Sequence, residues 1–322
     1  MKKALVTGAG GQDGSYLVEL LLKKDYEVFA LIRRKETSYR NLNSIWNHPN
    51  LRFLYGDVQN ISSLICAFHK AWPDEVYNLA AQSFVPSSWM DAAFTFDVNA
   101  GGLARLLEAA ERIKPDARIY QAGTSEMFGY QEGHLNARSR MNPTSPYGVS
   151  KLAAHHLCQV YRKKGMFVVS GICFNHESPR RNREMVTMKI ASHVARFSRG
   201  VKEPLSLGSL DGQRDWGYAP DYVLGMWQML QQKKPVDYVL GTGETHSVDE
   251  FLSLALQSAK IDEQEFREKY LQQNSQFLRV GDVKIFKADI RTTKKELNWE
   301  PKLPFPELVR CMVSSEIESL RG

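Results

Sequence analysis

The sequence has few cysteines and no long hydrophobic run. Its 322 residues include four cysteines, and none of the spacings between Cys66, Cys158, Cys173 and Cys311 suggests a metal site or a disulfide framework. Scattered thiols are typical of a reducing compartment, so we expect a cytoplasmic protein that holds no metal. No segment approaches the ~20 apolar residues needed to span a membrane, and glycines interrupt the apolar start of the chain before a signal peptide could form.

No part of the chain concentrates charge of one sign. The net charge is +6 and the pI is near 9.0, but the basic residues are dispersed and many are paired with acids along helical segments. We therefore do not expect nucleic acid as a partner, since a binding surface for it would need a basic patch or stripe. Hydrophobic residues make up 43% of the chain and charged residues 24%, which is ordinary for a folded globular protein.

Strand-like and helical patterns alternate through residues 1–175. Short apolar runs predict strands at residues 3–7, 27–32, 52–55, 75–79, 118–122 and 167–174. Helical spacing lies between them, at residues 14–24, 61–71, 99–113 and 146–163. This alternation predicts an α/β fold with a doubly wound parallel sheet of the Rossmann type.

The pattern changes after this first part. Arg- and Pro-rich loops follow residue 178, with a basic helix at 186–199 and short β segments at 205–207 and 238–240. We expect residues 1–175 to bind a dinucleotide and carry the catalytic residues. Residues 176–322 should form mainly a smaller α/β domain for the substrate.

A glycine-rich loop follows the first predicted strand and precedes the first helix. Gly8, Gly11 and Gly14 surround Gln12 and Asp13 in this loop. Glycines at such a turn let the backbone approach a pyrophosphate, which then lies on the helix N-terminus. A merely flexible loop is the alternative, but the flanking strand and helix favour a cofactor site.

Two arginines end the second predicted strand, where an NAD-binding protein usually has an acid that binds the ribose. Guanidinium groups match phosphate geometry, so Arg33 and Arg34 favour the 2′-phosphate of NADP over NAD. An arginine that is simply exposed remains the alternative. The residues expected beside the adenine, the ribose and the nicotinamide are Asp57, Val58, Leu79, Ala81 and Ser83.

Tyr147 and Lys151 lie four residues apart on one predicted helix and therefore share a face. The ammonium can lower the pKa of the phenol, which then takes a proton from a hydroxyl group during hydride transfer. Glu126 precedes this pair and provides a further base. Alcohol oxidation alone does not need that base, whereas oxidation followed by loss of water does.

Seven motifs together connect the chain to a known family. They are Thr7 to Ser15 (TGAGGQDGS), Asn78 to Val85 (NLAAQSFV), Gln121 to Gly129 (QAGTSEMFG), Ser145 to Lys151 (SPYGVSK), Phe174 to Arg181 (FNHESPRR), Val186 to Ile190 (VTMKI) and Arg214 to Tyr218 (RDWGY). The chain resembles the extended short-chain dehydrogenase/reductase superfamily and, within it, the GDP-mannose 4,6-dehydratases. The resemblance covers nearly the whole length.

This resemblance implies a hydro-lyase with a bound NADP and a GDP-sugar substrate. Tyr147, with Lys151 and Thr124, takes the proton of the C4 hydroxyl; Glu126 then removes the C5 proton and water leaves from C6. The resemblance also places His176 and Arg181 near the cofactor. Toward the substrate it places Ser83, Ser125, Asn175, Glu177, Lys189, Arg214, Arg279 and Asp282. A homodimer or homotetramer is implied by the segment 34–40, which is similar to a loop that reaches a neighbouring subunit.

Departures from the family pattern leave alternatives open. The segment 130–144 is short and basic and lacks acids that the mannose enzymes commonly have there, so a related sugar such as GDP-manno-heptose is an alternative substrate. A GDP-4-keto-6-deoxy-sugar reductase or an epimerase of the same superfamily is the alternative activity. A third hypothesis is an NADP-binding regulator without turnover, which the intact catalytic residues disfavour.

Overall fold

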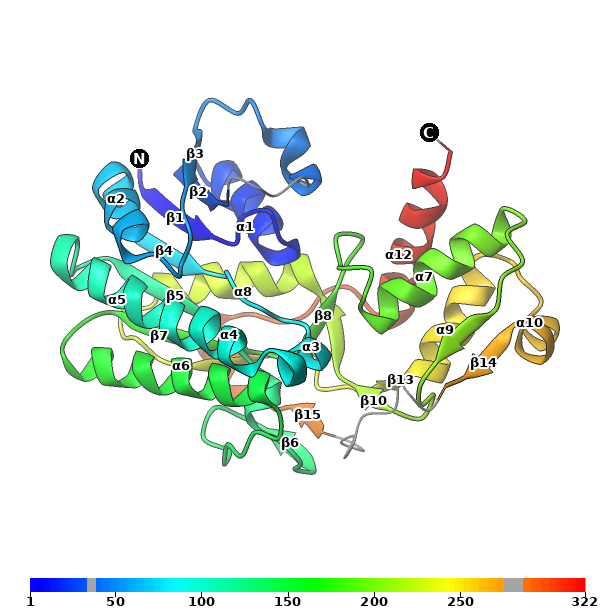
Figure 1. Cartoon of the computed structure of the whole chain (residues 1–322). Helices are drawn as coiled ribbons and strands as arrows, with labels where there is room; N and C mark the ends of the chain where they lie inside the picture. The colour runs from blue at the N-terminus through cyan, green and yellow to red at the C-terminus, as the bar shows by residue number, and fades with distance from the viewer. Residues whose placement is uncertain (34–38, 275–285, 322) are drawn as a thin grey trace.

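The computed structural model describes residues 1–33, 39–274 and 286–321. Seven parallel strands form one sheet in the order β12-β7-β5-β4-β1-β2-β3, which confirms the doubly wound prediction (Figure 1). The strands are β1 (Lys3–Thr7), β2 (Glu27–Ile32), β3 (Leu51–Tyr55), β4 (Glu75–Asn78), β5 (Arg118–Thr124), β7 (Val168–Cys173) and β12 (Tyr238–Leu240). Most central strand residues are buried, as expected for a parallel sheet with helices on both faces.

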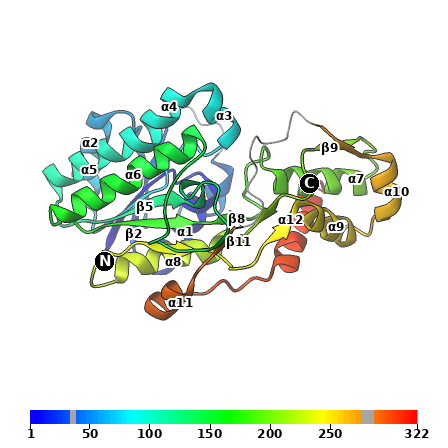
Figure 2. The ribbon, with the colours of Figure 1, turned by 90° about the horizontal axis from the view of Figure 1, so that it is seen from below.

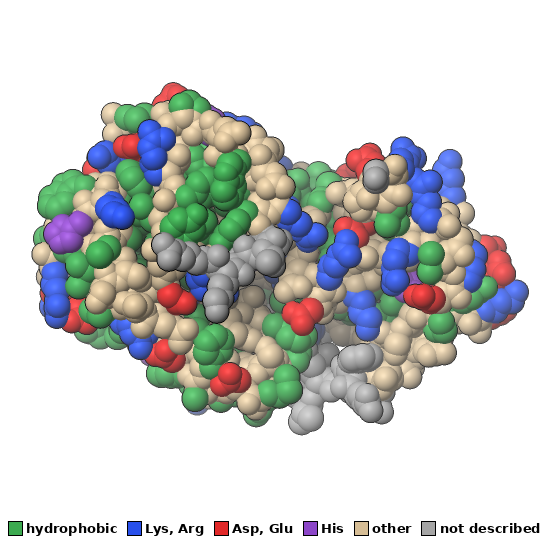
Figure 3. Space-filling model, turned by 45° about the horizontal axis from the view of Figure 1, so that its top comes forward, with side chains coloured by type: hydrophobic (Ala, Val, Ile, Leu, Met, Phe, Trp, Pro, Cys, Tyr) green, Lys and Arg blue, Asp and Glu red, His purple; other side chains and the backbone are tan. Residues whose placement is uncertain are grey.

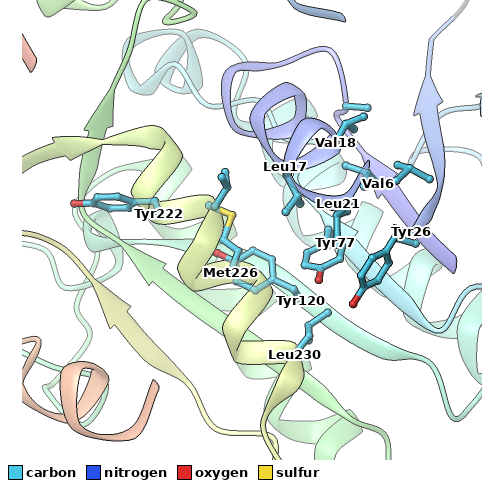
Figure 4. Packing of buried hydrophobic residues seen from close by; sticks show 14 of the residues in the cluster. Val6, Leu17, Val18, Leu21, Tyr26, Tyr77, Tyr120, Tyr222, Met226 and Leu230 are labelled. Carbon is cyan, nitrogen blue, oxygen red and sulfur yellow. The ribbon is translucent and has the colours of Figure 1, made fainter. Parts of the chain in front are cut away.

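Helices cover both faces of this sheet. One face carries α2 (Ile61–Ala71), α5 (Gly102–Ile113) and α6 (Pro146–Lys163), and the other carries α1 (Gln12–Lys23) and α8 (Ala219–Gln231). Figure 4 shows Leu17 and Leu21 of α1 and Met226 of α8 packed around the sheet residues Tyr77 and Tyr120. This burial holds the N-terminus of α1 against the ends of the strands.

The helix of the Tyr-Lys pair begins where the sequence predicts. Ser145 caps α6, since its hydroxyl accepts the Gly148 N–H at 3.1 Å, and Pro146 occupies the first turn. The predicted helix at 99–113 begins differently, with a π-helical turn at Asp97–Gly101 before α5.

A second core lies in the C-terminal part. It is formed by α7 (Val186–Ser198), α9 (Val248–Ser258), α10 (Glu263–Lys269) and α12 (Phe305–Ser319), with β9 (Leu205–Leu207) paired to β14 (Leu271–Gln273). Figure 2 shows this part beside the sheet, with β8 (Asn175–Glu177) and β11 (Trp216–Tyr218) between the two. The C-terminal part thus has a hydrophobic core of its own.

The large sheet continues past residue 175, where the sequence suggested a boundary. The β segment at 238–240 was expected in the smaller domain, but β12 pairs in parallel with β7, and α8 packs on α1. All three residues of β12 are buried, because they close the sheet edge against α8 and α11 (Arg291–Leu297). The chain thus returns to the first domain after entering the second.

Short elements complete the described chain. They are the 3₁₀ turns Arg40–Ile45 and Ser125–Met127, α3 (Val85–Met90), α4 (Ala92–Phe96), β6 (Gly133–Leu135) with β15 (Phe286–Ala288), and β10 (Gln213–Arg214) with β13 (His246–Ser247). Among the described residues, no helix has the length and apolar content of a membrane span.

Candidate active site

A cavity of about 1580 Å³ extends from the carboxyl ends of β1, β4 and β5 to the C-terminal part. It exceeds the ~300–1,000 Å³ typical of a pocket for one small ligand, so it has room for two. Every described residue that the sequence placed in the site lines this cavity: Gly8, Gly11, Gln12, Asp13, Gly14, Arg33, Asp57, Val58, Leu79, Ala81, Ser83, Thr124, Ser125, Glu126, Tyr147, Lys151, Asn175, His176, Glu177, Arg181, Lys189 and Arg214. Arg34, Arg279 and Asp282 lie outside the described residues.

The glycine loop forms a narrow cradle at the start of α1. Gly8 has a φ of +65°, and a Cβ added there would lie 2.8 Å from the Ala80 nitrogen. A Cβ on Gly14 would lie 2.2 Å from the Gly8 carbonyl oxygen. Larger residues would therefore push this loop toward the cavity, and the glycines keep the helix N-terminus open to an anion. This geometry fits the pyrophosphate of a dinucleotide.

The four predicted catalytic side chains, Thr124, Glu126, Tyr147 and Lys151, line the same cavity. The side chains of Thr124 and Tyr147 are hydrogen-bonded, and Glu126 lies close enough to influence the phenol electrostatically. The Lys151 ammonium donates to the Ala122 carbonyl oxygen at 3.0 Å and lies 5.9 Å from the centre of the Tyr147 ring. An acid, a phenol and an amine thus share one water-poor space.

Burial dominates the protonation of this group. It lowers the pKa of Lys151 to about 8 and raises the pKa of Tyr147, while Thr124 and Arg181 act against the rise at the phenol. We expected Lys151 to lower the pKa of Tyr147; the side chains that act against the effect of burial in the structure are Thr124 and Arg181. With a pKa near 8, Lys151 is still mainly an ammonium at neutral pH.

Asp13 and His176 form an ion pair across the two parts of the molecule. The His176 Nε2 donates to the Asp13 Oδ2 at 2.8 Å, and its Nδ1 donates to the Phe174 carbonyl oxygen at 2.7 Å. Although burial opposes both shifts, the pair raises the pKa of His176 and lowers that of Asp13. We assigned both side chains to the cofactor from the sequence, but each is already bound to the other. They fasten the glycine loop to β8.

Asn99, which the sequence reasoning missed, supports a loop that lines the cavity without lining it itself. It lies in the π-helical turn, where its amide nitrogen donates to the Gln82 carbonyl oxygen and to the Ser150 hydroxyl, both at 3.0 Å. Its amide oxygen accepts the Gln82 N–H at 2.9 Å. Asn99 therefore ties the loop after β4 to α6. A signal was present, because Asn99 falls on the same helical stripe as Leu103 and Leu106.

Cationic side chains line the substrate side of the cavity. Lys189 donates to the Ser206 carbonyl oxygen at 2.7 Å, and Arg214 donates to the Gln213 carbonyl oxygen at 2.7 Å. Arg181 lies 3.0 Å from the Glu177 carboxylate, which also accepts the Thr187 hydroxyl at 2.6 Å. Glu177 is thus buried against Arg181, and in the described contacts it acts as a support for that cation. Figure 3 shows Lys and Arg side chains over the C-terminal part.

None of the described residues forms a cluster of three or more side chains that could hold a metal ion. The side chains that line the cavity include a carboxylate, a phenol, an amine and several cations, beside the glycine loop.

Comparison with known proteins identifies relatives along the whole chain. The family model described as GDP-mannose 4,6 dehydratase matches residues 5–312. GDP-mannose 4,6 dehydratase 1 of Arabidopsis thaliana is 42% identical over 98% of this chain and 90% of its own length. The human GDP-mannose 4,6 dehydratase is 38% identical over 99% of this chain and 92% of its own length. Among solved structures, the UDP-glucuronic acid 4-epimerase of Bacillus cereus, in complex with UDP-glucuronic acid and NAD, has a TM-score of 0.86 at 27% identity and covers 99% of this chain and 100% of its own.

Proposed function

The chain belongs to the GDP-mannose 4,6-dehydratase family, and from this premise we propose that it converts a GDP-sugar to its 4-keto-6-deoxy form. It is a nucleotide-sugar 4,6-dehydratase, a hydro-lyase with a nicotinamide cofactor. The observation that supports the proposal is the cavity that Glu126, Tyr147 and Lys151 line together beside the glycine loop, with Glu126 close enough to Tyr147 to raise its pKa.

The residues of the chain divide the reaction between them. The cofactor, when bound, supplies a reversible hydride acceptor. Tyr147 takes the proton of the C4 hydroxyl, and the hydrogen-bonded Thr124 and the cation of Arg181 stabilise the phenolate. The Lys151 ammonium, 5.9 Å from the centre of the Tyr147 ring, adds positive charge on the same side. The C4 ketone acidifies the C5 proton, and Glu126 removes that proton and gives one to the C6 hydroxyl, which leaves as water. Return of the hydride to C6 and of a proton to C5 would complete the 4-keto-6-deoxy sugar without net redox change. The partly buried cations Lys189 and Arg214, which line the cavity on the substrate side, hold the diphosphate.

NADP is the cofactor form in this proposal. Arg33 follows β2 and lines the cavity, where a guanidinium suits a 2′-phosphate better than it suits the diol of NAD. Replacement of Arg33 with Ala is expected to weaken NADP binding about tenfold or more while NAD binding changes little, since a charged hydrogen bond is worth about 1.5–3 kcal/mol. Fluorescence titration with both dinucleotides measures this, and equal losses would favour NAD.

Incubation with GDP-mannose and a catalytic amount of NADP tests the activity. A dehydratase forms keto product without a net change in NADPH, whereas a ketosugar reductase consumes NADPH and a regulator forms no product. The same assay with a panel of GDP-, CDP-, UDP- and dTDP-sugars, GDP-manno-heptose included, identifies the substrate. Mannose and a heptose are both consistent with the proposal, because the segment 130–144 departs from the family pattern on the sugar side.

Replacement of Glu126 with Gln is expected to lower keto-product formation by at least about 100-fold, since a positioned base contributes about 10²–10⁴. Sugar oxidation should survive, so reduced cofactor should accumulate in the absorbance trace. Glu132→Gln is the control, because Glu132 is an exposed acid near the site that does not line the cavity. Full turnover by the Glu126 variant would show that another group removes the C5 proton.

The location and the assembly complete the proposal. The four cysteines are free thiols, which supports a cytoplasmic enzyme. Self-association into a homodimer or homotetramer is supported by apolar side chains exposed on α3, α4 and α6.

A further inference from the structure

We propose that Asp215 is a positioning residue that holds Arg214 against the main sheet and thereby sets the affinity of the enzyme for its nucleotide sugar. This inference rests on the proposed function, because it takes Arg214 as a ligand of the substrate diphosphate. Asp215 itself has no contact with the cavity: it is 1% exposed and is absent from the cavity wall, whereas its neighbours Arg214 and Trp216 both line that wall.

The opposite directions of these three side chains follow from the local backbone. Asp215 links β10 to β11, and successive side chains of an extended chain point to opposite sides. Arg214 and Trp216 therefore face the cavity, and the carboxylate between them points into the protein. Hydrogen bonds that hold the Asp215 carboxylate therefore also hold the adjacent backbone of Arg214.

Four donors converge on the Asp215 carboxylate. Its Oδ1 accepts the N–H and the hydroxyl of Thr242, both at 2.7 Å, and its Oδ2 accepts the N–H of Gly243 at 2.9 Å and the N–H of Ala288 at 3.1 Å. Three of the four are backbone groups, whose positions are set by the fold. Charge-assisted bonds of this kind are stronger and more directional than neutral ones.

The donors belong to the domain that carries the catalytic residues. Thr242 and Gly243 follow β12, the edge strand of the main sheet, and Ala288 ends β15, which pairs with β6. These segments are packed tightly, since a Cβ on Gly241 would lie 2.2 Å from the Cβ of Ala288. Asp215 therefore joins the wall that carries Arg214 to the domain that carries Tyr147 and Glu126 (Figure 1).

A separate aromatic contact holds β11 and β13, the strands next to Arg214. The Phe305 ring is stacked between His246 of β13, at 3.8 Å, and Trp216 of β11, at 5.9 Å, and β13 pairs with β10. This stack does not involve Asp215. Loss of the carboxylate should consequently let the Arg214 backbone shift without unfolding the C-terminal core.

The test compares Asp215→Asn with a matched variant. The amide nitrogen of Asn cannot accept the N–H groups of Gly243 and Ala288, so KM for the GDP-sugar and the dissociation constant for GDP should rise about tenfold or more. The turnover number kcat and NADP affinity should change less than about twofold. Asp221→Asn is the control, because Asp221 accepts the N–H groups of Lys302 and Leu303 at 2.8 and 3.2 Å outside the cavity wall. That variant should lose stability with GDP affinity unchanged.

Several outcomes decide the matter. Unchanged GDP affinity in Asp215→Asn would overturn the inference, as would equal losses of GDP and NADP affinity, which indicate general destabilisation. If Asp215→Asn does not fold, Thr242→Ala removes one donor, and its GDP affinity should fall in the same direction by a smaller factor; unchanged affinity in that variant overturns the inference. The GDP titration needs no turnover, so an inactive wild type would contradict the proposed function and still leave Asp215 decided by binding.

Discussion

Burial shifts the pKa values of Lys151 and Tyr147 and so controls their protonation. Lys151 is 3% exposed, and its ammonium persists at neutral pH because its pKa falls only to about 8. Tyr147 is also buried, and burial raises its pKa, so the phenol needs its neighbours before it can act as a base. Thr124 and Arg181 lower that pKa. The reactivity of this phenol is therefore a property of the assembled site.

The buried ammonium should make stability depend on pH. The amine of Lys151 releases its proton near pH 8 in the folded protein but near pH ~10.4 in the unfolded chain. Between these values the unfolded chain binds more protons, so wild-type stability should rise with pH. Lys151→Met should therefore melt at a higher temperature than wild type at about pH 7, with the difference shrinking as the pH rises through about 8 toward 10.

Thermal melts of both proteins without cofactor, recorded across this pH range, measure the effect. Lys163→Met is the control, since Lys163 is an exposed residue of the same helix, and it should give no such gain at neutral pH. A Lys151→Met protein that is less stable at every pH would show that the ammonium is stabilised in the folded state.

At the scale of elements, the loop between the end of β1 and the start of α1 forms the expected binding site for the cofactor pyrophosphate. The glycine loop follows β1 of the main sheet, and its Asp13 is bound by His176 of β8. Its shape therefore depends on both parts of the molecule. The 3₁₀ turn at 40–45 contributes as well, because the Asn41 amide nitrogen donates to the Gly10 carbonyl oxygen at 3.1 Å. A change in this loop should consequently affect cofactor binding more than it affects the C-terminal core.

Two glycines of the same loop should differ sharply in tolerance. Gly14→Ala would bring a methyl group within 2.2 Å of a backbone oxygen, whereas Gly10→Ala meets its nearest neighbour, a Tyr39 ring carbon, at an ordinary 3.6 Å. We expect Gly14→Ala to lower the free energy of unfolding by roughly 1–3 kcal/mol and to weaken cofactor binding strongly, as overpacking does. Gly10→Ala should stay near wild type. Urea unfolding and dinucleotide titration measure both, and matching behaviour of the two variants would contradict the packing of this loop.

At the scale of the whole molecule, two cores share one chain that crosses between them more than once. The chain leaves the main sheet after β7, enters the C-terminal part through β8, and returns for α8 and β12. The cavity between the parts is therefore bordered by segments far apart in sequence. One face of the sheet domain remains apolar on its outside, where Met90 is 83% and Phe96 46% exposed.

That face should hold a second copy of the chain. Charge introduced there would oppose burial, so the double variant Met90→Glu and Phe96→Glu should be a monomer of about 36.7 kDa while the wild type has at least twice that mass. Light scattering after size-exclusion chromatography measures the mass. Val201→Glu places the same charge on an exposed apolar residue of another surface and should leave the mass unchanged. A wild type that is already a monomer would remove this proposal.

The local elements and the family of the chain could be predicted from the amino-acid sequence. Short apolar runs predicted the six N-terminal strands to within a residue or two, because strands of a parallel sheet are buried on both faces. Helical spacing predicted α6, because burial of one face repeats along a helix. The motifs predicted a GDP-mannose 4,6-dehydratase, which the relatives confirm, and side chains that line one cavity. Motifs are enough to predict these residues, because the reactive side chains of each motif lie within a few residues of one another in the sequence.

The tertiary structure alone decided which distant segments meet. Asp13 and His176 are 163 residues apart, and Asp215 and Ala288 are 73 apart, so no local spacing encodes either contact. The position of β12 in the main sheet could not be predicted from the sequence either. A three-residue apolar run is compatible with either domain until the strand that it pairs with, here β7, is known. Residues that bind a ligand carry recognisable chemistry, whereas residues that position them are defined by the partners that packing brings to them.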